Sequence, residues 1–272
     1  MSILLKYESV IRFGFFFGML ILMNLWETAL PCRRYAPSLV RWFSNLGLLV
    51  LGTTILRAVF PLAAVGMAAM VEEHQWGLLN VVPLAHGQTL VLSIVILDFT
   101  TYVQHVLFHV WPLLWRVHKV HHADRGFDVT TGLRFHPLEI LLSTVSKIAI
   151  IVLLGAPAMA VLIFEVVLNA TSMFNHGNVQ LPKPVDRILR LLVVTPDMHR
   201  IHHSAMVQET NSNFGFNIPW WDHLFGTYRP RPSVSPQEMT IGLGEYQKDQ
   251  RVEQLPWMLM LPFEGRSDDG LG

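Results

Sequence analysis

Eight histidines in three groups are the residues of this chain whose spacing indicates chemistry. They are His105, His109, His118, His121, His122, His199, His202 and His203. Side chains three or four positions apart on a helix project from one face, so each group directs several imidazoles to one place. Imidazole binds iron, copper, nickel and zinc alike, and eight imidazoles exceed the roughly four ligands of one tetrahedral ion. The spacing therefore predicts a site for two metal ions.

The remaining cysteine and histidine residues limit the alternatives. Cys32 is the single cysteine, which excludes a disulfide framework and any cysteine-based zinc or iron–sulfur site. A solvated or core role would suit one group of histidines but does not suit three. His74 and His86 stand in a loop away from the groups, and we expect both to be solvated. Any metal is therefore held by nitrogen and oxygen ligands.

Long apolar segments must position these histidines. Of the 272 residues, 51% are hydrophobic and 15% are charged, and the formal net charge is zero. This composition is typical of a membrane protein, and no excess of positive charge favours nucleic-acid binding. The apolar segments, each long enough to cross a bilayer, are residues 10–30, 46–71, 89–110 and 138–174. The last is broken at Gly155-Ala-Pro157, which predicts a tight helical hairpin.

One stripe of the third apolar segment carries Asp98, Tyr102, His105 and His109. These positions share a helix face. A charged aspartate facing lipid would be unfavourable, so we expect Asp98 to face the bundle. There it would tune the site through hydrogen bonds without binding metal.

Other apolar segments also contain charged residues. Lys147 and Glu165 are nearly equidistant from the predicted hairpin turn, so they are placed to form a pair across it. Arg57 interrupts the second segment, together with Pro61. An arginine within a span indicates either a functional site or a contact with a carbonyl or a lipid headgroup, and both interpretations stay open.

Two helices are expected before the last histidine group. Residues 183–194 predict a short amphipathic helix with basic residues on one side, suited to the cytoplasmic membrane interface. Thr195 and Pro196 then predict a helix start, with threonine as the cap and proline at the first position. The histidines that follow share one face of this second helix.

Arginine distribution predicts the orientation. Arg33, Arg34 and Arg41 follow the first apolar segment, whereas residues 72–88 contain no Lys or Arg. The positive-inside rule places the arginines in the cytoplasm and residues 72–88 outside. The predicted fold is therefore an all-α, multi-pass transmembrane bundle of about four to five hydrophobic segments, with a histidine-rich helical cap at the cytoplasmic face.

Four sequence motifs that flank the histidines also match a known pattern. They are Asp98-Phe-x-x-Tyr102, Trp115-Arg-x-His118-Lys-Val-His121-His122, Leu133-Arg-Phe-His136-Pro-Leu-Glu139 and Asn213-Phe-Gly-Phe-Asn-Ile-Pro-Trp-Trp-Asp222. Over about residues 90–230 the chain resembles the fatty acid hydroxylase and sterol desaturase superfamily of membrane-bound di-iron enzymes. It departs from the common pattern at Val106, where arginine often follows the first histidine, and at His223, where a basic residue is frequent.

The resemblance implies a cofactor, its ligands and a reaction. The eight histidines would be the catalytic ligands of two non-haem irons, His176 a further ligand, and His136 either a ligand or a neighbour of one. Four more residues are expected beside the ligands, namely Asp98, Tyr102, Asp222 and His223. With O2 as co-substrate, such an enzyme hydroxylates or desaturates a C–H bond of a sterol, a fatty acyl chain or a related lipid. Its electrons would come from a separate ferredoxin or cytochrome b5-type donor with a reductase.

Three parts of the chain follow from this resemblance. Residues 1–88 are expected to form N-terminal membrane helices, 89–230 the di-iron domain, and 231–272 a polar tail. Within the tail, the apolar residues 255–263 would dock on the bundle or on the membrane surface, and the final residues are expected to be disordered.

Two other functions fit part of the pattern. A haem-binding electron-transfer subunit also uses paired histidines in membrane helices, and a metal transporter also places metal ligands within a bundle. A transporter, however, requires polar groups across the bilayer midplane, whereas the histidines here gather at one end of the spans. Haem would reveal itself by an intense Soret absorption band.

Overall fold

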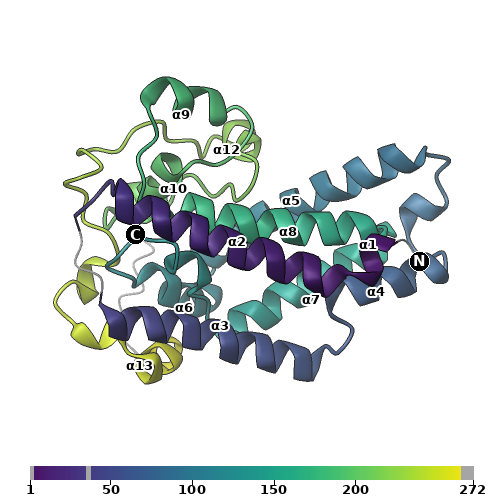
Figure 1. Cartoon of the computed structure of the whole chain (residues 1–272), viewed down its shortest axis with the longest axis horizontal. Coiled ribbons are helices and arrows are strands. Elements are labelled where there is room, and N and C mark those ends of the chain that lie inside the picture. Colours follow the sequence, from purple (N-terminus) through teal and green to yellow (C-terminus); the bar gives the residue numbers. More distant parts are fainter. Residues whose placement is uncertain (1–2, 35–37, 265–272) are drawn as a thin grey trace.

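The computed structural model describes residues 3–34 and 38–264, so the final residues, for which the sequence predicts disorder, lie outside the described part. Within these ranges the chain is helical, with two isolated β-bridges and no strand. Figure 1 shows long helices forming a bundle, with most of the shorter helices gathered at one end. The long helices are α2 (Glu8–Ala29), α3 (Leu39–Val59), α5 (His86–Val110), α7 (Pro137–Leu154) and α8 (Ala158–Asn175). Five segments are long and apolar enough to cross a membrane, which confirms the predicted all-α membrane bundle.

The second apolar segment differs from its prediction at its start, and it is interrupted at Pro61 as the sequence indicates. Its helix begins at Leu39 instead of near residue 46, because the Ser38 hydroxyl accepts a hydrogen bond from the Arg41 backbone N–H at 3.3 Å and caps the helix. The helix ends at Val59, and α4 (Ala63–Glu73) follows after a short break. Pro61 lies in the break, where its missing N–H prevents continuation of α3. The segment therefore consists of two helices in succession.

The predicted hairpin is formed by α7 and α8. Gly155 ends α7 with φ +77°, a left-handed conformation that favours glycine. A Cβ at this position would lie 2.5 Å from the Trp76 carbonyl oxygen, so the turn also requires glycine for close packing. Ala68 of α4 joins Ile151 and Phe164 in the largest buried apolar cluster. Helix α4 thus covers the half of the hairpin that is remote from the short helices.

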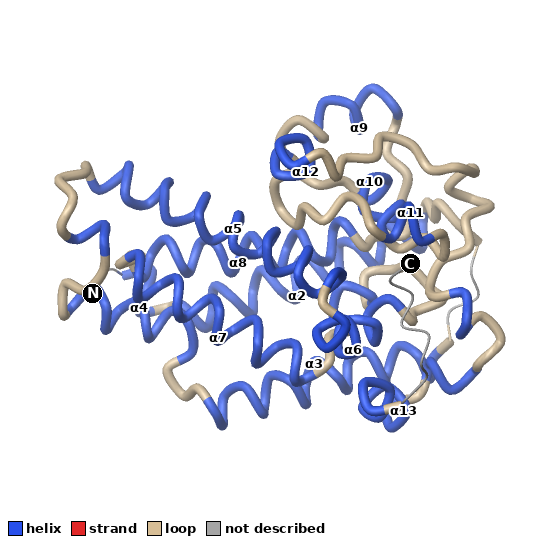
Figure 2. The backbone as a smooth tube through the Cα atoms, turned by 180° about the vertical axis from the view of Figure 1, so that it is seen from behind, coloured by secondary structure: helices blue, strands red, loops and turns tan. Residues whose placement is uncertain are grey.

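The short helices and long loops form a cap at the other end of the bundle (Figure 2). Its helices are α6 (Pro112–His122), α9 (Lys183–Leu189), α10 (Pro196–His202), α11 (Val207–Thr210), α12 (Trp220–Phe225) and α13 (Leu255–Met260). Trp257 and Met258 of α13 pack with Leu48 of α3 and Val120 of α6. Residues 255–263 were expected to dock either on the bundle or on the membrane surface, and the structure shows them on the bundle.

Helix α9 forms within the segment predicted to be amphipathic, but it is only seven residues long. It exposes Val185 and Ile188, and the following Leu191 and Leu192 are exposed as well. The Trp220 indole N–H of α12 donates to the Leu191 carbonyl at 2.6 Å. Together α9 and α12 present an apolar surface on the cap, as expected of a segment that contacts a membrane interface.

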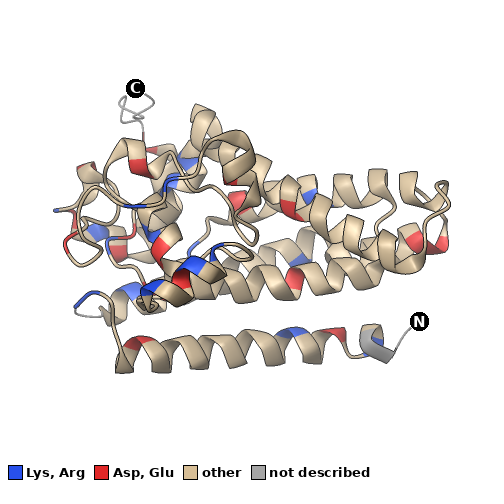
Figure 3. Ribbon diagram, turned by 90° about the horizontal axis from the view of Figure 1, so that it is seen from above, with Lys and Arg blue, Asp and Glu red and all other residues tan. Residues whose placement is uncertain are grey.

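Charged residues are frequent in the cap and sparse along the long helices (Figure 3). The predicted pair across the hairpin is confirmed, since the Lys147 Nζ lies 2.7 Å from the Glu165 Oε1. Arg12 of α2 contacts the other oxygen of Glu165 at 2.5 Å. Two cations from two different helices therefore meet one carboxylate inside the bundle.

Candidate metal centre

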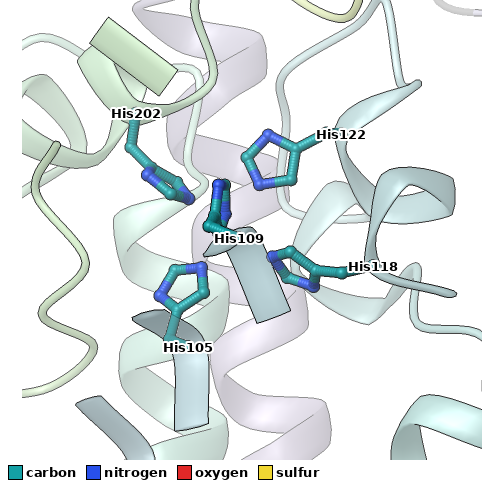
Figure 4. Close-up of side chains that lie close together, drawn as sticks. All are labelled: His105, His109, His118, His122 and His202. Atoms are coloured by element: carbon teal, nitrogen blue, oxygen red, sulfur yellow. The ribbon is translucent and has the colours of Figure 1, made fainter. Parts of the chain in front are cut away.

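Nine buried histidines form two groups where the bundle meets the cap. The first histidine group is His105, His109, His118, His122 and His202, and the second histidine group is His121, His176, His199 and His203. Within each group one ring nitrogen of every member lies within 4.8 Å of those of the others. Figure 4 shows the first group converging from α5, α6 and α10. The structure thus brings together all eight histidines singled out by spacing, and His176 with them.

Local sequence signals place these side chains. In α10, the Thr195 hydroxyl accepts a hydrogen bond from the Met198 backbone N–H at 3.3 Å, and Pro196 occupies the first position. The predicted helix start is therefore confirmed. His176 follows the last residue of α8, so the hairpin returns it to the level of the cap. In α5, His105 and His109 lie on the buried stripe predicted from the sequence.

Hydrogen bonds at Nδ1 orient several rings of the first histidine group. The Nδ1–H of His105 donates to the Phe214 carbonyl at 2.8 Å, and that of His202 to the Ser212 carbonyl at 2.8 Å. The opposite nitrogen, Nε2, is then the atom available to a ligand. Four of these Nε2 atoms are buried without any hydrogen-bond partner, namely those of His109, His118, His122 and His202. Buried unpaired nitrogens facing one another are unfavourable by themselves, and a metal ion would satisfy them.

The second histidine group converges even more closely. The Nε2 atom of His176 lies 3.0 Å from that of His199 and 3.1 Å from that of His121. Both ring nitrogens of His203 are buried without a partner. Three ring nitrogens this close fit a shared cation, so this donor set also suits a metal.

Burial keeps the cap histidines in the form that binds metal. Desolvation lowers the pKa of His176 to about 4. Desolvation, followed by the neighbouring imidazoles, lowers the pKa values of six others well below the ordinary value, namely His118, His121, His122, His199, His202 and His203. Metal binding requires the neutral imidazole. The environment of the groups therefore favours the ligand form at neutral pH.

A cavity of about 310 Å³ borders both histidine groups and extends between the long helices. Its wall near the cap includes His105 and His118 of the first group and His121 and His199 of the second. Apolar side chains such as Leu97 and Leu133 line it further along. The volume is within the range of small-molecule sites, roughly 300–1,000 Å³. The arrangement allows an apolar molecule to reach the two groups from inside the bundle.

Comparison with known proteins identifies the family. The family model described as fatty acid hydroxylase matches residues 90–227, which include every histidine of the two groups. The chain belongs to the fatty acid hydroxylase family. This match confirms the resemblance to that superfamily, which the histidine spacing and the flanking sequence motifs indicated.

Curated relatives of this fatty acid hydroxylase family member carry names of lipid enzymes. An ornithine lipid hydroxylase of Rhizobium tropici is 39% identical over 53% of the chain and 43% of the relative. The alkylglycerol monooxygenase of Homo sapiens is 25% identical over 48% of the chain and 28% of the relative. The cholesterol 25-hydroxylase of Rattus norvegicus is 26% identical over 52% of the chain and 47% of the relative. The matched stretch thus covers less than half of each relative. No solved structure matches the chain.

Glu139 is a residue of the site that the sequence analysis did not single out. It is buried, and its Oε1 accepts a hydrogen bond of 2.7 Å from the Nδ1–H of His118. A carboxylate that fixes the tautomer of a ligand histidine is common in metal sites. The available signal was a glutamate in the first turn of α7, within the motif that begins at Leu133.

Replacing Glu139 with glutamine is expected to weaken metal binding by roughly 10- to 100-fold, the usual effect of losing such a partner. The amide keeps the shape of the carboxylate but not its charge. Iron content measured against a series of free-iron concentrations tests this expectation, with Glu245→Gln in the cap as the matched control. Equal affinity of both variants and the parent would contradict the assigned role of Glu139.

Asp222 supports His105 through the backbone. Its two carboxylate oxygens accept hydrogen bonds of 2.8 Å from the backbone N–H groups of Phe214 and Gly215. The Phe214 carbonyl in turn accepts from the Nδ1–H of His105. These contacts agree with the expectation that Asp222 lies beside the candidate ligands.

The other residues expected beside the ligands lie further away. Asp98 accepts a hydrogen bond of 2.7 Å from the Trp221 indole, and the Tyr102 hydroxyl lies 3.0 Å from that of Thr227. These contacts tie α5 to α12, which holds Trp221, and to the following loop, which holds Thr227. His223 is exposed and packs against the Tyr228 ring at 3.9 Å between centroids.

The structure does not bring His136 into either histidine group. Its Nδ1 accepts a hydrogen bond from the Leu138 backbone N–H at 3.2 Å, and its Nε2 faces the Leu259 carbonyl at 3.3 Å. Both ring nitrogens thus have partners, and the residue caps α7. His136 therefore has no nitrogen left for a metal.

Proposed function

We propose that this chain is a membrane-bound lipid hydroxylase in which each histidine group holds one iron ion. The observation that carries the proposal is the convergence of nine buried histidines, several with unpartnered nitrogens, in two adjacent groups. Two bound irons would supply the activation of O2 for attack on a C–H bond. The chain itself holds the ligands neutral and oriented, and its cavity presents the substrate to them.

Family membership supports iron over other metals, because imidazole alone suits several of them. The relatives are named hydroxylases and monooxygenases, which favours hydroxylation over desaturation. A haem site fits the geometry less well. The rings of His109, His122 and His202 lie 4.7 Å apart, centroid to centroid, around one point, which leaves no open plane for a macrocycle.

The substrate in this proposal is a lipid that enters the cavity from the membrane. An ornithine lipid is the first candidate to test, because the relative with 39% identity is named for it. The electrons come from a separate donor, a ferredoxin or a cytochrome b5-type protein with its reductase.

A direct test compares lipid extracts of host cells that make ornithine lipids. Cells producing the parent chain are expected to contain lipids heavier by one oxygen atom, measured by mass spectrometry. Cells producing a variant with His202→Ala are expected to lack them. Identical extracts from both, with the parent protein present and loaded with iron, would overturn the proposed hydroxylation of these lipids.

The proposed orientation places the cap, α9 and the C-terminus in the cytoplasm. Loops at the far end of the bundle, 74–85 and 155–157, contain no Lys or Arg, whereas cap segments contain many, consistent with the positive-inside rule. A reporter fused after residue 272 is expected to be active only on the cytoplasmic side. A matching fusion within 78–82 should show the opposite. A C-terminal reporter active only outside would contradict this orientation.

A further inference from the structure

Part of the cavity wall is charged. Lys147 and Arg12 both contact Glu165, at 2.7 and 2.5 Å, and all three line the cavity. Arg57 lines it too. We call these four residues the charged wall. Ionisable groups within a membrane are unfavourable unless paired, and they usually mark a functional site.

The charged wall carries an excess of positive charge. Glu8 also contacts Arg12, at 3.2 Å, so two carboxylates, Glu8 and Glu165, face three cations. The cation left over is Arg57, whose side chain makes no hydrogen bond or ion pair within the described ranges 3–34 and 38–264. An apolar chain end would form no hydrogen bond or ion pair with these residues, whereas an anionic group would form an ion pair with Arg57.

We infer that the charged wall binds an anionic group of the lipid substrate, a carboxylate or a phosphate, between Arg57 and the Lys147 and Arg12 cations. The aliphatic part of the same molecule then extends through the apolar part of the cavity to the histidines. This inference rests on the proposed function, since it names the class of lipid that the cavity accepts.

Helix geometry indicates which part of the lipid meets the histidine groups. Lys147 lies eight residues after Glu139 on α7, about 12 Å along the axis at about 1.5 Å per residue. Glu139 is hydrogen-bonded to His118. A lipid whose charged group contacts Lys147 therefore presents a chain carbon to the histidines, and its charged group stays remote from them.

Polar uncharged residues line the cavity between its two ends. Thr100, Gln104 and Ser143 all contribute to the wall, and the Gln104 side-chain amide donates to the Ser143 hydroxyl at 2.8 Å. These uncharged polar groups add to the charged wall, so a large part of the cavity lining is polar. The cavity thus suits an amphiphile better than a hydrocarbon of the same length.

Equilibrium binding to the full-length protein in nanodiscs of neutral lipid tests the inference. Three probes of equal chain length are compared: hexadecanoate, hexadecyl phosphate and hexadecanol. At least one anion is expected to bind roughly ten-fold or more tightly than the alcohol, because hydrogen bonds between charged groups are among the stronger ones. The preferred anion distinguishes a carboxylate lipid from a phosphate lipid.

Arg57→Gln is the decisive variant, because Arg57 is exposed and unpaired, so the fold does not depend on it. It is expected to reduce anion binding roughly ten-fold and to leave hexadecanol binding unchanged, while Arg57→Lys restores most of the preference. Arg187→Gln, the same charge loss on exposed α9, is the control. Equal binding of both anions and the alcohol by the parent, or equal anion binding by Arg57→Gln and Arg187→Gln, would overturn the inference.

Failure of this inference is distinguishable from failure of the proposed function. Probe binding is measured without turnover, on protein with and without iron. A protein that holds two irons but shows no preference for anions would refute only the proposed anion site at the charged wall. A protein that prefers anions but holds no iron would refute only the proposed hydroxylase function.

Discussion

Replacing one histidine from either group with alanine is expected to abolish lipid hydroxylation and to remove iron from the protein. His109 represents the first histidine group and His199 the second. Each substitution removes a ligand outright, so the loss should exceed the roughly 10- to 100-fold effect of removing a partner that only orients a ligand. Iron content and product formation in purified protein are the measurements.

The exposed His223 provides the matched control, because it lies outside both groups. His223→Ala is expected to keep its iron and most of its activity. Membrane insertion should be unchanged in all three variants, since the apolar segments keep their length and hydrophobic character. Full turnover by both ligand variants would refute the ligand assignment.

Replacing Arg41 with alanine is expected to destabilise the protein by about 3–5 kcal/mol, the usual effect of breaking a buried ion pair from one side. Its side chain is 0% exposed and contacts Asp124 at 2.6 and 2.8 Å and Asp128 at 2.6 Å. The guanidinium counteracts desolvation and holds the pKa of Asp124 far below its ordinary value. Without it, the buried Asp124 would lose its ion-pair partner and keep hydrogen bonds from the Thr131 hydroxyl and the Gly126 backbone N–H.

Unfolding of the purified protein in mixed micelles measures this loss. Arg251, whose side chain is 54% exposed beside Asp249, is the control, and Arg251→Ala is expected to leave the unfolding transition unchanged. An unfolding free energy of the Arg41 variant equal to that of the parent would show that the ion pair does not hold α3 against the cap.

The membrane helices and most of the candidate metal centre could be predicted because their signals are local. Apolar length predicts a span, and Gly155 with Pro157 predicts the hairpin. Histidines three and four apart predict rings on one face. Each of these signals depends on helix geometry alone, which the sequence determines within a few turns.

The parts that could not be predicted depend on contacts between distant segments. Glu139 meets His118 only because α6 and α7 pack together, and His136 is excluded because its nitrogens meet α7 and the segment near Leu259. Arg41 looked like a loop charge for orientation, yet it is buried against Asp124. Tertiary packing decides all three, and no local spacing encodes it.

Metal analysis of anaerobically purified protein tests the central claim most directly. We expect about two irons per chain, one for each histidine group, and no Soret band. His109→Ala and His199→Ala should each lower the iron content, whereas His223→Ala should not. One metal ion per chain or fewer, or bound haem, would contradict a two-iron site in the histidine groups.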